Sequence, residues 1–142
     1  MEMKILIKKI DPEAKVPKNA LPGDAGLDLF SVENIVLKPS QKASVKTGIA
    51  VKIPEGYTGL IWDKGGISHK NGIKSLGGVF DSNYTGEWLI GLINLGNEDF
   101  SIKRGQKIAQ VLFQKIELPE IEEVDKFEAT NRGEGRFGST GL

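Results

Sequence analysis

The chain has 142 residues, enough for one domain with a substantial core and too few for two comfortable ones. Its 19 basic and 19 acidic side chains balance, so nothing suggests a general affinity for nucleic acid or an anionic membrane. Cysteine is absent and His69 is the single histidine, which argues against disulfide scaffolds, zinc sites and Ser-His-Asp chemistry. Without a signal-peptide region or an apolar run of about 20 residues, we expect a soluble, cytoplasmic protein.

Short β-branched runs separated by glycine, proline and asparagine recur along most of the chain, and helical periodicity is nearly absent. The sequence therefore predicts an all-β domain, either a sandwich, a jelly roll or a small barrel. A short helical turn is predicted around residues 66–71. The predicted strands are residues 4–9, 35–37, 43–53, 58–62, 88–94, 100–102 and 107–118.

Asp28 alternates with apolar neighbours in residues 24–30. A carboxylate at such a position either faces solvent or points to the buried or pocket-facing side of a strand, where it needs a partner or a metal. Both orientations fit the local sequence. Gln110, within the last predicted strand, similarly fits a cross-strand hydrogen bond or a ligand contact.

The segment of residues 62–68 ends a strand with Lys64, Gly65 and Gly66, directly before the predicted helical turn. Backbone N–H groups at the start of a helical turn can bind an anion. The segment therefore indicates a candidate anion-binding loop.

Residues 72–87 are bracketed by glycines and predict a hairpin whose backbone a ligand can approach closely. Near its tip, Asp81 follows an apolar pair and precedes a polar pair. A carboxylate there can orient a water as a general base, or it can cap the backbone of its own turn. Tyr84 fits either the core or a ligand contact.

The tail, residues 130–142, contains many glycines together with two arginines, one phenylalanine and hydroxyl side chains. Such a segment cannot bury enough apolar surface to offset its conformational entropy. Its composition is typical of a frayed terminus. Its side chains also suit a nucleotide, because arginine pairs with phosphate and an aromatic ring stacks on a base.

Five segments together resemble the motifs of the homotrimeric dUTP pyrophosphatases, the dUTPases. The resemblance extends along nearly the whole chain, and five motifs in the correct order over about 120 residues are far more specific than one. The segments are residues 25–29, residues 64–66 with 70–73, residues 78–86, residues 104–110 and residues 132–141.

The resemblance implies a distorted jelly roll or β-barrel over residues 1–125 and a flexible glycine-rich lid over residues 126–142. It also implies that three copies assemble and share active sites. The implied reaction is the Mg²⁺-dependent hydrolysis of dUTP to dUMP and pyrophosphate, which limits uracil incorporation into DNA and supplies dUMP for dTMP synthesis.

The resemblance also assigns roles by position. Asp81 is the implied base that activates water for attack on the α-phosphorus, and Asp28 reaches Mg²⁺ through water, since the phosphates hold the ion. Tyr84 packs on the deoxyribose. The other implied contacts are Lys64, Gly65, Gly66 and Gln110 at phosphates, Gly77, Gly78 and Val79 at the uracil edge, Arg132 and Ser139 at the terminal phosphates, Phe137 stacked on the base, and Gly138 at the substrate.

Two positions depart from the family pattern. Gly65 stands where the family has a serine that contacts the phosphate chain, and Arg136 stands where the tail motif usually has glycine. Loss of one donor that stabilises transition-state charge costs about 10²–10³ in kcat. The turnover rate therefore depends on whether another residue of this loop supplies the missing hydrogen-bond donor, and Ser68 is one candidate for that role.

Two other functions are weighed against the first. A dCTP deaminase-like enzyme has a related fold and phosphate sites, but Tyr84 and the tail phenylalanine favour the diphosphatase branch. A module that binds dUTP without turnover is the second alternative, and Gly65 is the reason to consider it.

Overall fold

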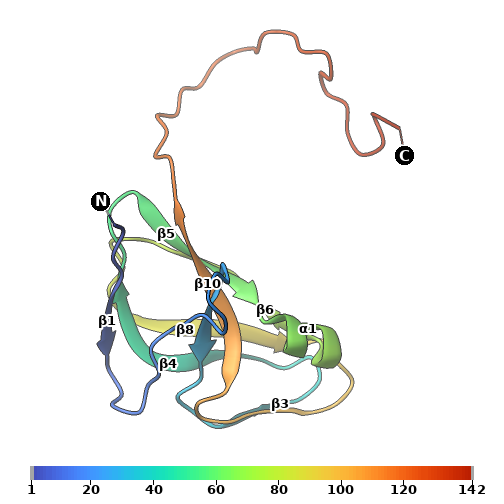
Figure 1. Ribbon diagram of the computed structural model, residues 1–142. Helices are drawn as coiled ribbons and strands as arrows, with labels where there is room; N and C mark the ends of the chain where they lie inside the picture. The colour runs from blue at the N-terminus through green and yellow to red at the C-terminus, as the bar shows by residue number, and fades with distance from the viewer. Residues whose placement is uncertain (1, 142) are drawn as a thin grey trace.

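The computed structural model describes residues 2–141, which form ten strands and one short helix. Two four-stranded antiparallel sheets, in the orders β1-β4-β8-β6 and β2-β10-β5-β7, face each other, and β3 pairs with β9 in a small third sheet (Figure 1). The expected β-rich class is confirmed. In chain order the elements are β1 (Leu6–Lys9), β2 (Leu27–Phe30), β3 (Ile35–Leu37), β4 (Lys42–Lys52), β5 (Tyr57–Asp63), α1 (Gly65–Asn71), β6 (Ile73–Ser75), β7 (Val79–Phe80), β8 (Glu87–Asn94), β9 (Phe100–Ile102) and β10 (Lys107–Lys115).

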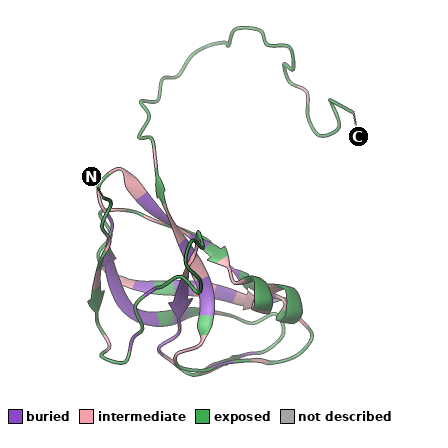
Figure 2. Cartoon of the chain, in the orientation of Figure 1, coloured by how far each residue is buried: buried purple, intermediate pink, exposed green. Residues whose placement is uncertain are grey.

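A single apolar core is built from the buried side chains of both sheets, and the buried residues lie on the strands rather than in the tail (Figure 2). In β8 every second side chain is buried, from Trp88 through Ile90 and Leu92 to Asn94, as expected for a strand with one face on a core. Asn94 is buried without cost to the core because its amide donates to the carbonyls of Leu37 and Glu98, each at 2.8 Å.

A bulge in β4 bends this long strand around the core. Gly48 has φ +71°, which favours glycine, and the register with β8 shifts between Lys46 and Ala50. The Gly48 N–H donates to Glu87 Oε2 at 3.0 Å, and its carbonyl accepts the Ile10 N–H at 2.7 Å. These bonds satisfy backbone groups that the bulge removes from the ladder.

The segment from Gly72 to Glu87 is not a self-paired hairpin, so that expectation is wrong. β6 pairs with β8 in one sheet, whereas β7 pairs with β5 in the other. Between them the chain crosses from sheet to sheet, with the Leu76 N–H bonded to the Gly91 carbonyl and the Ile61 N–H bonded to the Gly78 carbonyl. Pairing with long-range partners therefore replaces the local pairing that the glycines suggested.

The last strand is shorter than predicted. β10 ends at Lys115, not at residue 118, because after the Ile116 N–H bonds the Gly56 carbonyl the chain leaves the sheet. Residues 117–141 then extend away from the β-sheets (Figure 1), and all of them except Gly135 are exposed (Figure 2). Within residues 2–141, the helical part is too short and too polar to cross a bilayer.

Candidate active site

A buried carboxylate lies at the centre of the first group of predicted site residues. Asp28 in β2 pairs in register with Gln110 in β10, which in turn pairs with Trp62 in β5. Paired residues of antiparallel strands face the same side of a sheet, so these three side chains share the face of the sheet opposite the core. Asp28 is nevertheless only 2% exposed, which decides between the two orientations left open by the sequence.

Two lysines cover Asp28. Lys64 Nζ lies 2.5 Å from Asp28 Oδ1, and Lys107 Nζ lies 3.2 Å from Oδ2. Burial raises the pKa of Asp28, but the two ammonium groups outweigh burial and hold the pKa below its usual range. Oδ2 accepts no well-oriented hydrogen bond from residues 2–141. This oxygen therefore keeps acceptor capacity on a carboxylate that stays ionised.

Gln110 is held in place by the end of β5. Its Nε2 donates to the Asp63 carbonyl at 2.9 Å, and a Cβ at Gly26 would overlap Gln110 Oε1, so a larger residue there would displace the end of the Gln110 side chain. Gln110 thus makes the cross-strand hydrogen bond that the sequence allowed. It also lines an open hollow, so the predicted ligand contact stays open.

Asp63 links this end of β5 to β6. Its Oδ1 accepts the Ser75 N–H at 2.6 Å, and its Oδ2 lies 2.8 Å from Lys74 Nζ. Burial raises the pKa of Asp63, but the bonds from Lys74 and Ser75 outweigh it and hold the pKa below its usual range. The bonds of Asp63 to β6 therefore hold the start of the following loop in place.

The glycine pair of the candidate anion loop opens α1. Lys64 is the N-cap and makes no side-chain cap bond, and space is open where a Cβ would stand on Gly65 or Gly66. Gly72 ends the helix with φ 74° and packs so tightly that an added Cβ would lie 2.7 Å from the Gly96 N. The predicted helical turn is confirmed and extends over seven residues.

A hollow of about 370 Å³ lies between α1 and the outer face of the sheet. It brings Gly65 of the anion loop together with Gln110 of the sheet. Its walls are Trp62, Asp63, Gly65, Ser68, His69, Gln110 and Leu112.

The second group of predicted residues lies around the turn after β7. The Tyr84 N–H donates to the Asp81 carbonyl at 3.1 Å, and the Tyr84 hydroxyl donates to the Glu87 carbonyl at 2.8 Å. Tyr84 is 43% exposed, so it is not a core residue in this chain. The Asp81 side chain is exposed and lines an open hollow of about 470 Å³ with Ser82 and Asn83.

Aromatic packing supports this turn from below. The ring of Phe80, directly before Asp81, stacks on Trp88 with a centroid distance of 4.2 Å and an interplanar angle of 14°. The Thr58 hydroxyl also donates to the Phe80 carbonyl at 2.8 Å. The backbone that presents Asp81 is therefore attached to the core on one side and to β5 on the other.

Three more predicted contacts, Gly77, Gly78 and Val79, form the exposed approach to this turn. Space is open where a Cβ would stand on Gly77 or Gly78, so the backbone is accessible. The same stretch lines a small hollow of about 170 Å³ with Ile61 and the middle of β8.

The two groups are separated along β5. Gly59 pairs with Phe80, which precedes Asp81, whereas Lys64 follows the end of the same strand. Five residues of extended chain span about 17 Å. Within one chain, Asp81 and Lys64 therefore lie too far apart to contact the same phosphate.

The tail residues form a third group, apart from the other two (Figure 1). Arg132 Nε donates to the Gly135 carbonyl at 2.9 Å, and the Ser139 N–H donates to the Arg136 carbonyl at 2.8 Å. Gly138 has φ +81°. The Phe137 ring is fully exposed, so the tail makes local turns and presents its aromatic side chain to solvent.

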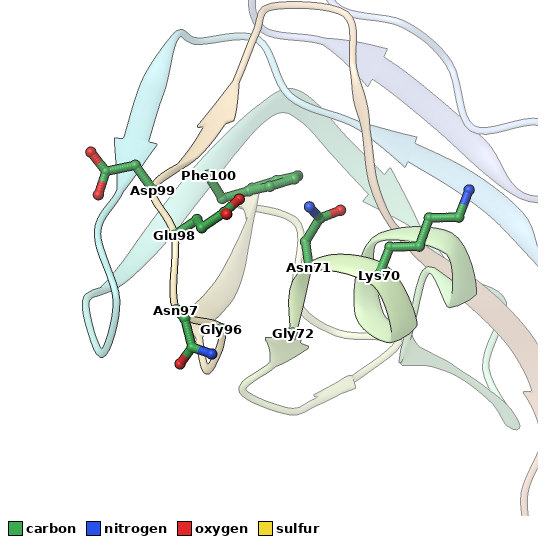
Figure 3. A pocket seen from close by; sticks show the side chains of 8 residues that line it. All are labelled: Lys70, Asn71, Gly72, Gly96, Asn97, Glu98, Asp99 and Phe100. Carbon is green, nitrogen blue, oxygen red and sulfur yellow. The ribbon is translucent and has the colours of Figure 1, made fainter.

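Another hollow, of about 310 Å³, lies at the far end of α1. Figure 3 shows Lys70 and Asn71 on one side of it and residues 96–100 on the other. It contains none of the predicted site residues. The candidate site is therefore assigned to the residues around Asp28 and Asp81.

The family model described as dUTPase matches residues 12–141, which include all three groups. This chain belongs to the dUTPase family. A deoxyuridine 5'-triphosphate nucleotidohydrolase of Clostridium kluyveri is 45% identical over 141 residues, covering 98% of this chain and 99% of that protein. The dUTPase of Staphylococcus bacteriophage 80alpha matches with a TM-score of 0.91 and 32% identity in one variant, covering 98% of this chain and 99% of that one.

Two further dUTPase structures carry ligands. A second variant of the 80alpha dUTPase, with dUpNHpp, has a TM-score of 0.88 and 32% identity, and covers 98% of this chain and 99% of its own. A variant of the dUTPase from phage phi11 of S. aureus, described with a structural Mg(II) ion, has a TM-score of 0.83 and 30% identity, and covers 89% of this chain and 99% of its own.

Lys107 is a residue of the candidate site, through its contact with Asp28, that the sequence did not predict. It stands at the first position of β10, three residues before Gln110, but the register with β2 shifts between Lys107 and Ala109. A count of alternating positions therefore could not place its side chain beside Asp28. The available signal was its position inside the fourth dUTPase-like segment.

Proposed function

We propose that this dUTPase-family chain hydrolyses dUTP to dUMP and pyrophosphate. The observation that carries the proposal is the extent of the family match, because residues 12–141 contain Asp28, Lys64, Asp81, Gln110 and the whole tail motif. A protein that shared only the fold would have no need for all three groups of residues.

We further propose that the protein acts as a homotrimer with shared active sites. Gly59, which pairs with the residue before Asp81, lies about 17 Å from Lys64 along β5, so a site that uses both Asp81 and Lys64 needs residues from more than one copy. The face that would meet another copy exposes large apolar side chains, with Trp62 55% and Val79 65% exposed. Exposed apolar residues beside a functional site are typical of interfaces.

In the assembled site, Asp81 is the general base. Its exposed carboxylate has room to hold a water in the hollow at the turn, and it removes a proton as the water attacks the α-phosphorus. Pyrophosphate leaves. Tyr84, fixed by its bond to the Glu87 carbonyl, packs on the deoxyribose where a 2′-hydroxyl would clash, and the accessible backbone of residues 77–79 reads the uracil edge.

The phosphates bind at the other group. Lys64 exchanges part of its pairing with Asp28 for a phosphate oxygen, while the N–H groups of Gly65 and Gly66 and the anchored amide of Gln110 donate to the others. The positive charge of Lys107 remains with Asp28 and keeps that carboxylate ionised after Lys64 moves.

The residues fit a magnesium ion that the substrate brings with it. The structure has no cluster of three or more acidic or histidine ligands within residues 2–141, whereas Asp28 Oδ2 lacks a well-oriented donor there. Mg²⁺ keeps several waters and binds through phosphates with one or two carboxylates. When bound, such an ion neutralises phosphate charge, and Asp28 would accept a hydrogen bond from one of its waters.

The tail, residues 126–142, is proposed as the lid of this site. Arg132 and Ser139 hold the terminal phosphates, and Phe137 with the flexible Gly138 covers the base. Closure of such a segment over a ligand orders it and excludes water from the reacting groups.

A substrate panel tests the reaction. Purified protein with Mg²⁺ should release pyrophosphate from dUTP and far less from dCTP, dTTP and UTP. A folded protein that releases none from dUTP but binds dUpNHpp is a binding module, and ammonia release from dCTP would indicate deamination. Either result would refute the proposed activity.

A further inference from the structure

One face of α1 is turned toward the hollow beside Gln110. Residues three and four positions apart lie on the same face of a helix, and Gly65, Ser68 and His69 have this spacing and line the hollow together. Gln110 of β10 lines the same hollow. The hollow therefore brings hydrogen-bonding side chains of the helix together with the amide of the sheet.

Ser68 is the better placed of the two polar residues on that face, because it is half-buried whereas His69 is exposed. Its backbone is committed to the helix: the N–H donates to the Lys64 carbonyl at 3.0 Å, and the carbonyl accepts the Gly72 N–H at 2.9 Å. Helical side chains lean toward the N-terminus, so Ser68 leans toward Gly65, where space is open.

We propose that the Ser68 hydroxyl donates a hydrogen bond to a phosphate oxygen of the bound nucleotide. The inference rests on the proposed function, which brings a triphosphate to Lys64 and Gln110. Gly65 and Gln110 line the same hollow as Ser68, and Lys64 directly precedes Gly65, so a phosphate that reaches both Gly65 and Gln110 lies next to Ser68. A hydroxyl rotates to meet its acceptor, and a charged acceptor strengthens the bond.

Two substitutions at Ser68 test the bond. Ser68→Ala removes the hydroxyl and keeps the helix, while Ser68→Thr keeps the hydroxyl. Ser68→Ala should lower kcat/KM for dUTP by about tenfold to a hundredfold, as expected for a lost bond to a charged group, and Ser68→Thr should retain most of the activity. The matched control is Ser101→Ala, an exposed serine on β9 that should leave kcat/KM unchanged.

A second hydroxyl on the same face separates ligand binding from a structural role. Gly65→Ser places one in open space one turn earlier, within reach of the same phosphate region. In that background Ser68→Ala should cost clearly less than in the native chain. A serine needed only for folding would cost the same in both backgrounds.

The possible results distinguish a failure of the proposed function from a failure of the proposed Ser68 hydrogen bond. If the native protein hydrolyses dUTP and Ser68→Ala behaves like Ser101→Ala, the role of Ser68 is refuted and the function stands. If the protein does not hydrolyse dUTP, the function fails, and dUpNHpp affinity by calorimetry decides the rest. Weaker binding by Ser68→Ala then supports the bond, while equal binding, or none by either protein, refutes it.

Discussion

Lys64 Nζ lies 2.5 Å from Asp28 Oδ1, although Asp28 belongs to β2 and Lys64 follows β5. The contact joins the first sequence motif to the second through a carboxylate that is 2% exposed. A charge buried this far is stable only with its partners in place. The pair therefore both stabilises the fold and holds the lysine at the start of the candidate anion-binding loop.

The first prediction concerns acid stability. The pKa of Asp28 lies below the ordinary aspartate value of 3.8, so its charged form stabilises the folded state above pH 4, and this contribution is lost as pH falls through the folded pKa. Asp28→Asn should cost about 1–3 kcal/mol at pH 7 because it removes both ion pairs; the cost stays below that of a fully buried pair because the two lysines are partly exposed and regain water. Urea unfolding from pH 7 to pH 3 should show this difference shrinking toward acid. Asp125→Asn, at an exposed position, serves as the control; a difference independent of pH would contradict the assignment.

The second prediction concerns the proposed base. Asp81→Asn should lower kcat by about 10²–10⁴ and leave dUpNHpp affinity nearly unchanged, because the amide keeps the shape but cannot accept the proton. Single-turnover pyrophosphate release and calorimetry measure the two effects. Asp99→Asn, also exposed, should alter neither. Normal turnover by Asp81→Asn would show that another group activates the water.

The third prediction concerns the sharing of sites between copies. Asp81→Asn and Lys64→Ala should each be nearly inactive alone. The two variants are then mixed in equal amounts, unfolded and refolded together. If each site takes Asp81 from one copy and Lys64 from another, each group is intact in half of the sites, so roughly one quarter of the sites should contain both intact groups. Refolding each variant with itself is the control. A mixture without recovered activity would place both groups of a site on one chain.

The fourth prediction compares two exposed phenylalanines. Phe137→Ala should weaken dUpNHpp binding about fivefold to a hundredfold, the range for one lost base stack. Phe127→Ala should have no effect, although its ring is also exposed, at 89%. Equal losses from the two variants would rule out a specific stack. Melting temperatures should match the native protein, because neither ring belongs to the core.

The fifth prediction concerns the support beneath Asp81. Trp88→Ala removes the ring on which Phe80 stacks and should lower the free energy of unfolding by about 3–5 kcal/mol. Trp88→Phe should cost much less, because it keeps an aromatic ring and removes an indole N–H that has no partner within residues 2–141. Urea titrations at one protein concentration compare them, with Leu118→Ala as an exposed control. Similar costs for both variants would mean that the stack contributes little.

Much of the β architecture could be predicted from the sequence, because long strands such as β4 and β8 carry their own β-branched and alternating patterns. The short strands β2, β6 and β7 could not. β7 has two residues and exists through its pairing with Gly59 and Leu60 of β5. β3 and β9, at three residues each, were predicted because they consist mostly of β-branched and other apolar residues, whereas β7 is fixed by its distant partner, which local propensity does not describe.

The candidate site divides in the same way. Residue types and motif order were enough to propose Asp81, Tyr84 and Gln110. The burial of Asp28 was not predictable, since it depends on Lys64 and Lys107, which are 36 and 79 positions away in the chain. The separation of the two groups along β5 was not predictable either, because it depends on the strand register.

The two tryptophans give this protein a natural pair of fluorescence reporters. Trp88 is fully buried beneath the turn that carries Asp81, whereas Trp62 is half exposed beside Gln110. The emission of Trp88 should therefore report the folding of the core, and the emission of Trp62 should report whether solvent reaches the outer face of the sheet. Folding and the covering of that face can then be timed separately in the unlabelled chain.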